Sequence, residues 1–231
     1  MYVRSQVGLW WHIRNDRHRH EEGTVNEPAR DYKAIATDTI RQEHRALGEV
    51  IELLQHLLHD IAADHTTPEF HLLSLALYYI DDFQSRLHHP KEEEHLFSAV
   101  RRHTRELDHT IAQLRSEHHT DAQTIRELHR LLVMYQAGAP DALRNLCTSL
   151  DVYAEMLHEH MRREEALIDD PRAALPEAEW RAIGAAFLAD EDPLFGTERR
   201  REFALLHHRI VNLLPRKMRR TAGTPRAGAE G

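Results

Sequence analysis

The chain has 231 residues, enough for one substantial core, and a formal net charge of −8 at pH 7 with histidine taken as neutral. This acidic balance argues against a nucleic-acid-binding protein, and the single cysteine, Cys147, excludes a disulfide framework or a thiolate metal cluster. The 20 histidines, against only 9 glycines and 9 prolines, favour an all-α protein that has a use for imidazole.

Residues 1–35 mix charged and polar residues without periodicity, and we interpret them as a mobile extension. The histidines of this segment are left out of any site, because a loose chain rarely fixes ligand geometry. The segment has no apolar run long enough for a signal peptide, and the apolar run at 72–80 is too short to span a bilayer. We therefore expect a cytoplasmic protein with no membrane partner.

From residue 36 the sequence shows helical periodicity, with apolar residues recurring every three or four positions. The expected helices cover about 36–65, 70–89, 103–134 and 141–167. Pro90 is expected to kink the second helix or to begin a fresh turn. Four helices joined by short turns predict an up-down-up-down four-helix bundle over residues 36–170.

Residues 171–214 contain two shorter amphipathic segments, which we expect to form C-terminal helices packed on the bundle. Their apolar positions are Trp180, Ile183 and Phe187 in the first segment and Phe203, Leu206, Ile210 and Leu213 in the second. Residues 215–231 are rich in Arg, Gly and Ala and lack an apolar stripe, so we expect a disordered tail.

Histidine and glutamate occupy positions of the apolar stripes where leucine would be expected. His44 lies in the stripe of the first helix and His118 in that of the third. His160 and Glu164 lie in the stripe of the fourth. A buried imidazole or carboxylate without a partner is costly, and coordination to a cation removes that cost. The stripes therefore indicate a metal site inside the bundle.

Two HxxxE pairs place a histidine and a glutamate one helical turn apart on the same face, close enough to bind one metal or to bridge two. The pairs are His88 with Glu92 and His160 with Glu164. His89 with Glu93 has the same spacing as the first pair, and Pro90 distorts the turn between them, so the register stays open. We prefer His88 with Glu92.

His44 and His118 complete the set from the two remaining helices. Four imidazole nitrogens and two carboxylates that can bridge suit a pair of iron ions, with manganese or zinc as the less favoured metals. A rival ExxH spacing, typical of ferritin-like di-iron proteins, occurs at Glu92 to His95 and at Glu155 to His158. The second of these pairs falls off the stripe of the fourth helix, which favours HxxxE.

The order H, HxxxE, H, HxxxE across four helices resembles the hemerythrin-like (HHE cation-binding) domain, of the bacterial type with a C-terminal extension. The matching stretches are EHRALGEVI (43–51), YYIDDFQSRLHHPKEEEHLF (78–97), LRSEHHTDAQTI (114–125), HMRREEALI (160–168) and EAEWRAIGAAFLADEDPLFG (177–196). The resemblance implies a non-heme di-iron centre with an oxo or hydroxo bridge. The ligands that it implies are His44, His88, Glu92, His118, His160 and Glu164.

One departure from the family pattern concerns the third helix. Oxygen-carrying hemerythrins have two histidines there as HxxxH, whereas this chain has Ala122 four residues after His118. His119 is one step round the helix and a poor substitute. The resemblance therefore implies a relative with fewer histidines, less suited to simple oxygen carriage.

The expected function is that of a non-heme di-iron protein that binds a small ligand, namely dioxygen, nitric oxide or peroxide. Two alternatives stay open: a di-iron enzyme acting on peroxide or nitric oxide, and an iron- or gas-sensing module that works through a protein partner. Tyr78, Tyr79 and Tyr153 are expected to serve mainly in packing, with a role as hydrogen-bond donors near the metals as the second possibility.

Overall fold

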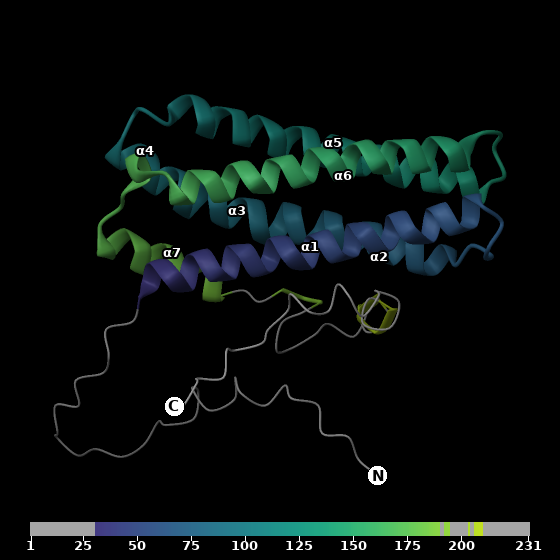
Figure 1. The fold of residues 1–231 in the computed structure, drawn as a ribbon, viewed down its shortest axis with the longest axis horizontal. Helices are drawn as coiled ribbons and strands as arrows, with labels where there is room; N and C mark the ends of the chain where they lie inside the picture. Colours follow the sequence, from purple (N-terminus) through teal and green to yellow (C-terminus); the bar gives the residue numbers. More distant parts are fainter. Residues whose placement is uncertain (1–30, 190–191, 195–202, 204–205, 210–231) are drawn as a thin grey trace, which may run out of the picture. The chain divides into compact units, whose positions relative to one another are not determined.

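We describe the protein from a computed structural model, in which residues 31–189, 192–194, 203 and 206–209 are placed well enough to describe. This part of the chain contains helices and no strand, which confirms the all-α prediction. The long helices are α1 (Tyr32–Ala62), α5 (Asp108–Gln136), α6 (Ala142–Asp169) and a run that extends from Phe70 to His103. They alternate in direction and lie along one another (Figure 1).

The four helical runs close into a ring, because each packs against two neighbours. Helix α1 contacts α6 and α2 (Phe70–Phe83), and α5 contacts the same two helices. Short connections at 63–69, 104–107 and 137–141 join successive helices. The last of these turns contains Gly138, whose positive φ of 72° is favourable for glycine. The predicted four-helix bundle is thereby confirmed.

The second helical run continues through Pro90, where the sequence predicts a kink or a fresh turn. Its segments are α2, a π-helical turn at Gln84–His88, α3 (His89–Lys91), a second π-helical turn at Glu92–Phe97, and α4 (Ser98–His103), and Pro90 lies in the first turn of α3. Proline lacks the N–H of an α-helical bond and its ring crowds the carbonyl four residues earlier, so a wider turn accommodates it. The backbone stays helical through His88 and His89.

The third helix also begins later than the predicted residue 103. The preceding run ends at His103, and Thr104 is extended, with φ −146° and ψ 152°. The Thr104 hydroxyl accepts a hydrogen bond from the Glu106 N–H at 3.2 Å, which supports the turn before Asp108. The boundary was missed because the apolar stripe continues across this turn through Leu107, which is buried.

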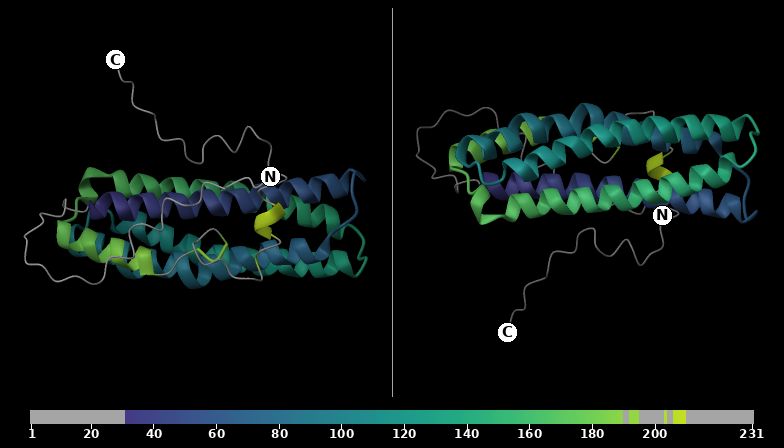
Figure 2. Two further views of the ribbon diagram at one scale, coloured as in Figure 1. Left: turned by 90° about the horizontal axis from the view of Figure 1, so that it is seen from below. Right: turned by 90° about the horizontal axis from the view of Figure 1, so that it is seen from above.

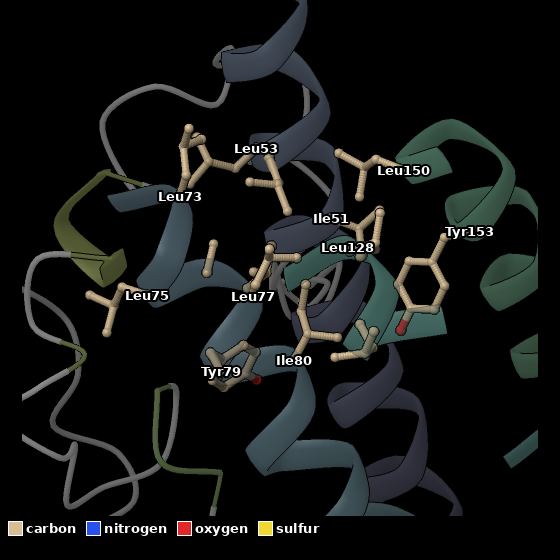
Figure 3. Packing of buried hydrophobic residues seen from close by; sticks show 14 of the residues in the cluster. Ile51, Leu53, Leu73, Leu75, Leu77, Tyr79, Ile80, Leu128, Leu150 and Tyr153 are labelled. Carbon is tan, nitrogen blue, oxygen red and sulfur yellow. The ribbon is translucent and has the colours of Figure 1, made fainter. Parts of the chain in front are cut away.

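The buried apolar residues form two clusters at different levels of the bundle. The first contains Leu47 to Ile61 of α1, with residues of α2, α5 and α6 such as Ile80, Leu128 and Tyr153 (Figure 3). The second contains Ile40, Phe97 and Leu114 among others. Residues 44, 88–92, 118 and 160–164 lie between the two clusters along the helices, so a polar layer there is enclosed by apolar packing on both sides.

The C-terminal helix α7 (Glu177–Ala189) packs beside α1, as Figure 2 shows. Its predicted apolar positions Trp180, Ile183 and Phe187 are buried in the second apolar cluster. Phe203 and Leu206 are buried in the first cluster, whereas Ile210 and Leu213 lie outside the described residues. Residues 1–30 of the expected N-terminal extension (1–35) and the expected tail also lie outside them, whereas residues 32–35 form the first turn of α1. None of the described helices has the length and apolar character to cross a membrane.

Candidate metal centre

The six side chains predicted as ligands meet in the polar layer between the two apolar clusters. They come from four helical runs and are His44, His88, Glu92, His118, His160 and Glu164. None of them exposes more than 7 % of its surface. Such a concentration of buried imidazoles and carboxylates needs compensation of its charge and of its hydrogen-bonding capacity.

A first group of potential ligands consists of His44, His88, Glu92 and Glu164, whose donor atoms all lie within 4.8 Å of one another. The Nε2 atoms of His44 and His88 are 3.1 Å apart. His88 Nε2 lies 3.4 Å from Glu92 Oε1, and His44 Nε2 lies 3.3 Å from Glu164 Oε2. One cation could contact all four side chains.

A second group consists of His89, His118 and His160, again with donor atoms within 4.8 Å of one another. The two glutamates of the first group reach this second group with their other oxygens. Glu164 Oε1 lies 3.1 Å from His118 Nε2 and 2.9 Å from His160 Nε2. Glu92 Oε2 lies 3.5 Å from His118 Nε2. Each glutamate therefore faces both groups, as a carboxylate that bridges two cations would.

The structure also addresses the choice between His88 and His89 that the sequence left open. His88 and Glu92 belong to the first group, while His89 belongs to the second, so both histidines face the interior. Glu93 does not join either group and instead contacts the far side of His118. The sequence did not predict that His88 and His89 would both face the interior. In a regular α-helix two adjacent side chains point in different directions, but the π-helical turns around Pro90 depart from this periodicity.

The rival candidates from the sequence lie elsewhere in the structure. His119 is exposed and hydrogen-bonds to Gln123. Glu155 is exposed, and His158 hydrogen-bonds through Nδ1 to the Ala154 carbonyl at 2.7 Å. His95 is not part of either group of potential ligands among the described residues.

A layer of carboxylates surrounds the inner histidines. In four of them Nε2 faces the inner glutamates, while Nδ1 contacts a different carboxylate. The Nδ1 contacts are His44 to Glu165 at 3.0 Å, His88 to Glu43 at 2.8 Å, His118 to Glu93 at 3.0 Å and His160 to Glu117 at 2.8 Å. When Nδ1–H donates to a carboxylate, Nε2 keeps its lone pair for a metal, so these contacts select the ligating tautomer.

Each of these outer carboxylates in turn meets a cationic side chain. The pairs are Glu43 with Lys91 at 2.7 Å, Glu93 with Arg115 at 3.0 Å, Glu117 with Arg163 at 3.0 Å and Glu165 with Arg41 at 3.8 Å. Sequence reasoning missed this outer layer. A signal was present, because each outer glutamate is adjacent in sequence to an inner residue, as in the dipeptides Glu43-His44 and Glu164-Glu165.

The pKa values of the buried glutamates and histidines show that the two carboxylates stay charged only when positive charge lies next to them. Burial and the neighbouring Glu164 carboxylate raise the pKa of Glu92 well above its usual range. Burial would also raise the pKa of Glu164, but His160, His118 and His44 hold it well below its usual range. Burial opposes the charging of His160, yet Glu164 and Glu117 raise its pKa to about 9. Without another cation, the imidazoles have to supply the charge that the glutamates require.

Unpaired polar atoms point to the same conclusion. Both carboxylate oxygens of Glu92, Oε2 of Glu164 and Nε2 of His160 are buried and form no hydrogen bond of regular geometry among the described residues, although His44 Nε2 lies 3.3 Å from Glu164 Oε2 and His160 Nε2 lies 2.9 Å from Glu164 Oε1. Buried lone pairs without a donor are rare in proteins and require an explanation. Oxygen and imidazole nitrogen are ligands for divalent metals, so the residues present fit a metal cation at this place.

The sequence as a whole agrees with this interpretation. The family model of the hemerythrin HHE cation binding domain matches residues 35–168. The match covers more than half of the chain and includes all seven residues of the two ligand groups. Among curated proteins, none matches the chain significantly.

Proposed function

The chain belongs to the hemerythrin HHE cation-binding domain family, and from this premise we propose that it is a non-heme di-iron protein that binds a small ligand in its bundle core. That it is a helical cation-binding domain follows from the family and from the two buried ligand groups. The identity of the metal, the number of ions and the small ligand are our proposal.

The observation that carries the proposal is the position of the two inner glutamates between the ligand groups. One ion would be held by His44 and His88, the other by His89, His118 and His160, with Glu92 and Glu164 bridging them. The opposed directions of the two oxygens of Glu164, toward His44 and toward His118, support a pair of ions over a single one.

The donor set favours iron. Five imidazoles and two carboxylates form a mixed nitrogen and oxygen set without a thiolate, which suits iron, while manganese and zinc are the less favoured metals. When bound, iron would supply redox chemistry and open coordination positions for dioxygen, nitric oxide or peroxide. We place this function in the cytoplasm, because a single cysteine in 231 residues fits a reducing compartment.

The chain's own residues would prepare the site for such a ligand. The outer carboxylates orient the imidazoles, and the apolar clusters on both sides exclude bulk water. His89 also changes one argument from the sequence. It brings a fifth imidazole to the cluster from the second helical run, so the lack of HxxxH in the third helix no longer speaks against oxygen binding.

The test is to load the full chain with ferrous iron under anaerobic conditions and to mix it with nitric oxide, dioxygen or hydrogen peroxide. We expect visible absorption bands of an iron centre that change with each ligand. Bands that return after removal of dioxygen indicate reversible binding, whereas continued consumption of ligand indicates turnover. Iron-loaded protein whose spectrum none of the three ligands changes would contradict the proposal.

A further inference from the structure

A second polar cluster lies next to the candidate metal centre, and of its members the sequence analysis considered only Tyr153, as a hydrogen-bond donor near the metals. It consists of Gln84, Asp121 and Tyr153, from three different helical runs. Gln84 precedes His88 by four residues and Asp121 follows His118 by three, so both lie about one helical turn, ~5 Å along the axis, from the ligand layer. In Figure 3 the hydroxyl of Tyr153 points away from α6 and into the bundle.

The three side chains form a closed hydrogen-bond network. In the amide orientation in which both the nitrogen and the oxygen of Gln84 have partners, the nitrogen donates to the two Asp121 oxygens at 2.5 and 3.0 Å. The amide oxygen accepts from the Tyr153 hydroxyl at 3.0 Å. The Tyr153 hydroxyl is also within hydrogen-bonding reach of Asp121. Gln84 and Tyr153 are 1 % exposed, while Asp121 keeps partial contact with solvent. Asp121 therefore links the buried core to water.

The environment of Asp121 makes it able to exchange a proton near neutral pH. Burial raises the pKa of Asp121 to about 6, although the Tyr153 hydrogen bond and the nearby imidazoles act to lower it. The titratable groups that face it are His118 on its own helix, Tyr153 and His160 on α6, and Asp81 on α2. Within the described residues its hydrogen-bond partners are Tyr153 and Gln84, so no such bond joins it to either ligand group.

We propose that Asp121, held by Tyr153 and Gln84, is the residue that exchanges protons between solvent and a protic small ligand bound beside His118 and His160. This inference rests on the proposed function and deepens it, because it singles out peroxide from the three ligand candidates. Dioxygen and nitric oxide carry no proton, whereas hydrogen peroxide is a weak acid that loses one when it binds a cation.

The proton step balances without any further reactant. The O–H bond of hydrogen peroxide breaks, and the proton passes to an Asp121 carboxylate oxygen, directly or through one water. The Asp121 carboxyl then releases the proton to solvent at its exposed edge. Gln84 donates hydrogen bonds to the carboxylate, and the single Tyr153 hydroxyl proton is shared between Gln84 and the carboxylate, so these bonds keep the acceptor in place between the two transfers.

The experiment compares Asp121→Asn with wild type in the iron-loaded full chain, with the iron oxidised to the ferric state before peroxide is added and kept ferrous for nitric oxide. Hydrogen peroxide and nitric oxide are mixed with each protein between pH 5 and 8, and an indicator dye records the proton released on peroxide binding. For wild type we expect a peroxide rate that rises with pH around a single midpoint, since the carboxylate form accepts the proton; this midpoint should lie below the pKa of about 6 of the metal-free protein, because the bound cations stabilise the carboxylate. In the variant we expect a rate about 10²-fold lower at pH 7 and no midpoint.

Two internal controls separate this inference from the proposed function. Nitric oxide binding and iron content should be the same in Asp121→Asn and wild type. Asp151→Asn is the matched variant, because Asp151 also accepts a hydrogen bond from a glutamine, Gln55 at 2.7 Å, but lies nine residues before His160. An unchanged peroxide rate and midpoint in Asp121→Asn, with normal iron and nitric oxide binding, would overturn the role of Asp121 alone. A wild type that binds neither iron nor nitric oxide would overturn both proposals.

Tyr153→Phe provides a second arm that keeps an aromatic ring in the core. Because the hydroxyl of Tyr153 lowers the pKa of Asp121, its removal should move the midpoint of the peroxide reaction to higher pH. The same upward shift should appear in the metal-free protein when the Asp121 carboxyl is titrated by carbon NMR. A midpoint that does not move in either measurement would overturn the proposed network.

Discussion

The imidazole rings of His89 and His118 are stacked, with centroids 3.8 Å apart and planes inclined by 10°. His89 belongs to the helical run around Pro90 and His118 to α5, so the stack joins two helices at the level of the ligand layer. His118 also contacts Phe97, whose ring centroid lies 5.7 Å away on the same run as His89. These contacts hold His89 in the second ligand group, where it would be the fifth imidazole of the centre.

The variant His89→Ala tests directly whether His89 is a ligand in the second group. We expect the metal content to fall from two ions per chain to about one, because the second group would keep only two imidazoles while the first group is untouched. Elemental analysis after iron loading measures the change. His119→Ala is the matched control, since His119 is exposed and bonds to Gln123. Equal metal content in the two variants would contradict a ligand role for His89.

The sequence was sufficient to predict the helices and the main ligand candidates, because both depend on periodicity. His160 and Glu164 interrupt a regular apolar stripe, and the structure buries them to 7 % and 0 % exposure. The place of His89 could not be predicted in this way, because it depends on π-helical turns that a regular period does not describe. Glu117 was missed for a different reason: it lies off the apolar stripe and looks like an ordinary surface charge.

Glu117→Gln tests the outer layer of carboxylates. Glu117 contacts His160 Nδ1 at 2.8 Å and fixes the orientation of that ring, so we expect metal affinity to fall by about 10- to 100-fold with little change in fold. Competition with a chelator measures the affinity. Glu127→Gln on the same helix is the control, because Glu127 is exposed and pairs with Arg130. If both variants kept wild-type affinity, Glu117 would have no part in holding the metal.

Asp121 should also affect how stability depends on pH. Its pKa is raised from 3.8 to about 6 in the folded protein, so the folded chain binds its proton more tightly than the unfolded chain does. The corresponding stabilisation is complete below about pH 4 and is lost as the pH rises through 6. We expect Asp121→Asn to gain stability relative to wild type between pH 4.5 and 7.5. Urea unfolding of both metal-free proteins at these two pH values measures the gain, and a constant difference would contradict the raised pKa.

Two helical glycines provide a matched test of helix packing. A Cβ added at Gly48 would meet only His158 Nε2 at 3.8 Å, an ordinary contact, so Gly48→Ala should stabilise the protein by about 0.5–1 kcal/mol. At Gly184 of α7 the added Cβ would lie 3.2 Å from the Tyr32 carbonyl oxygen, which is tight. We expect Gly184→Ala to be less stable than Gly48→Ala by about 1 kcal/mol or more. Equal thermal stability of the two variants would mean that α7 does not pack this closely on α1.

The most direct test of the central claim is an anomalous difference map, recorded at the iron absorption edge, from crystals of the iron-loaded protein. We predict two peaks about 3.5–4 Å apart, one beside His44 and His88 and the other beside His89, His118 and His160, with Glu92 and Glu164 between them. A single peak, peaks away from this layer, or no peak in protein that retains the four-helix bundle would contradict the di-iron assignment.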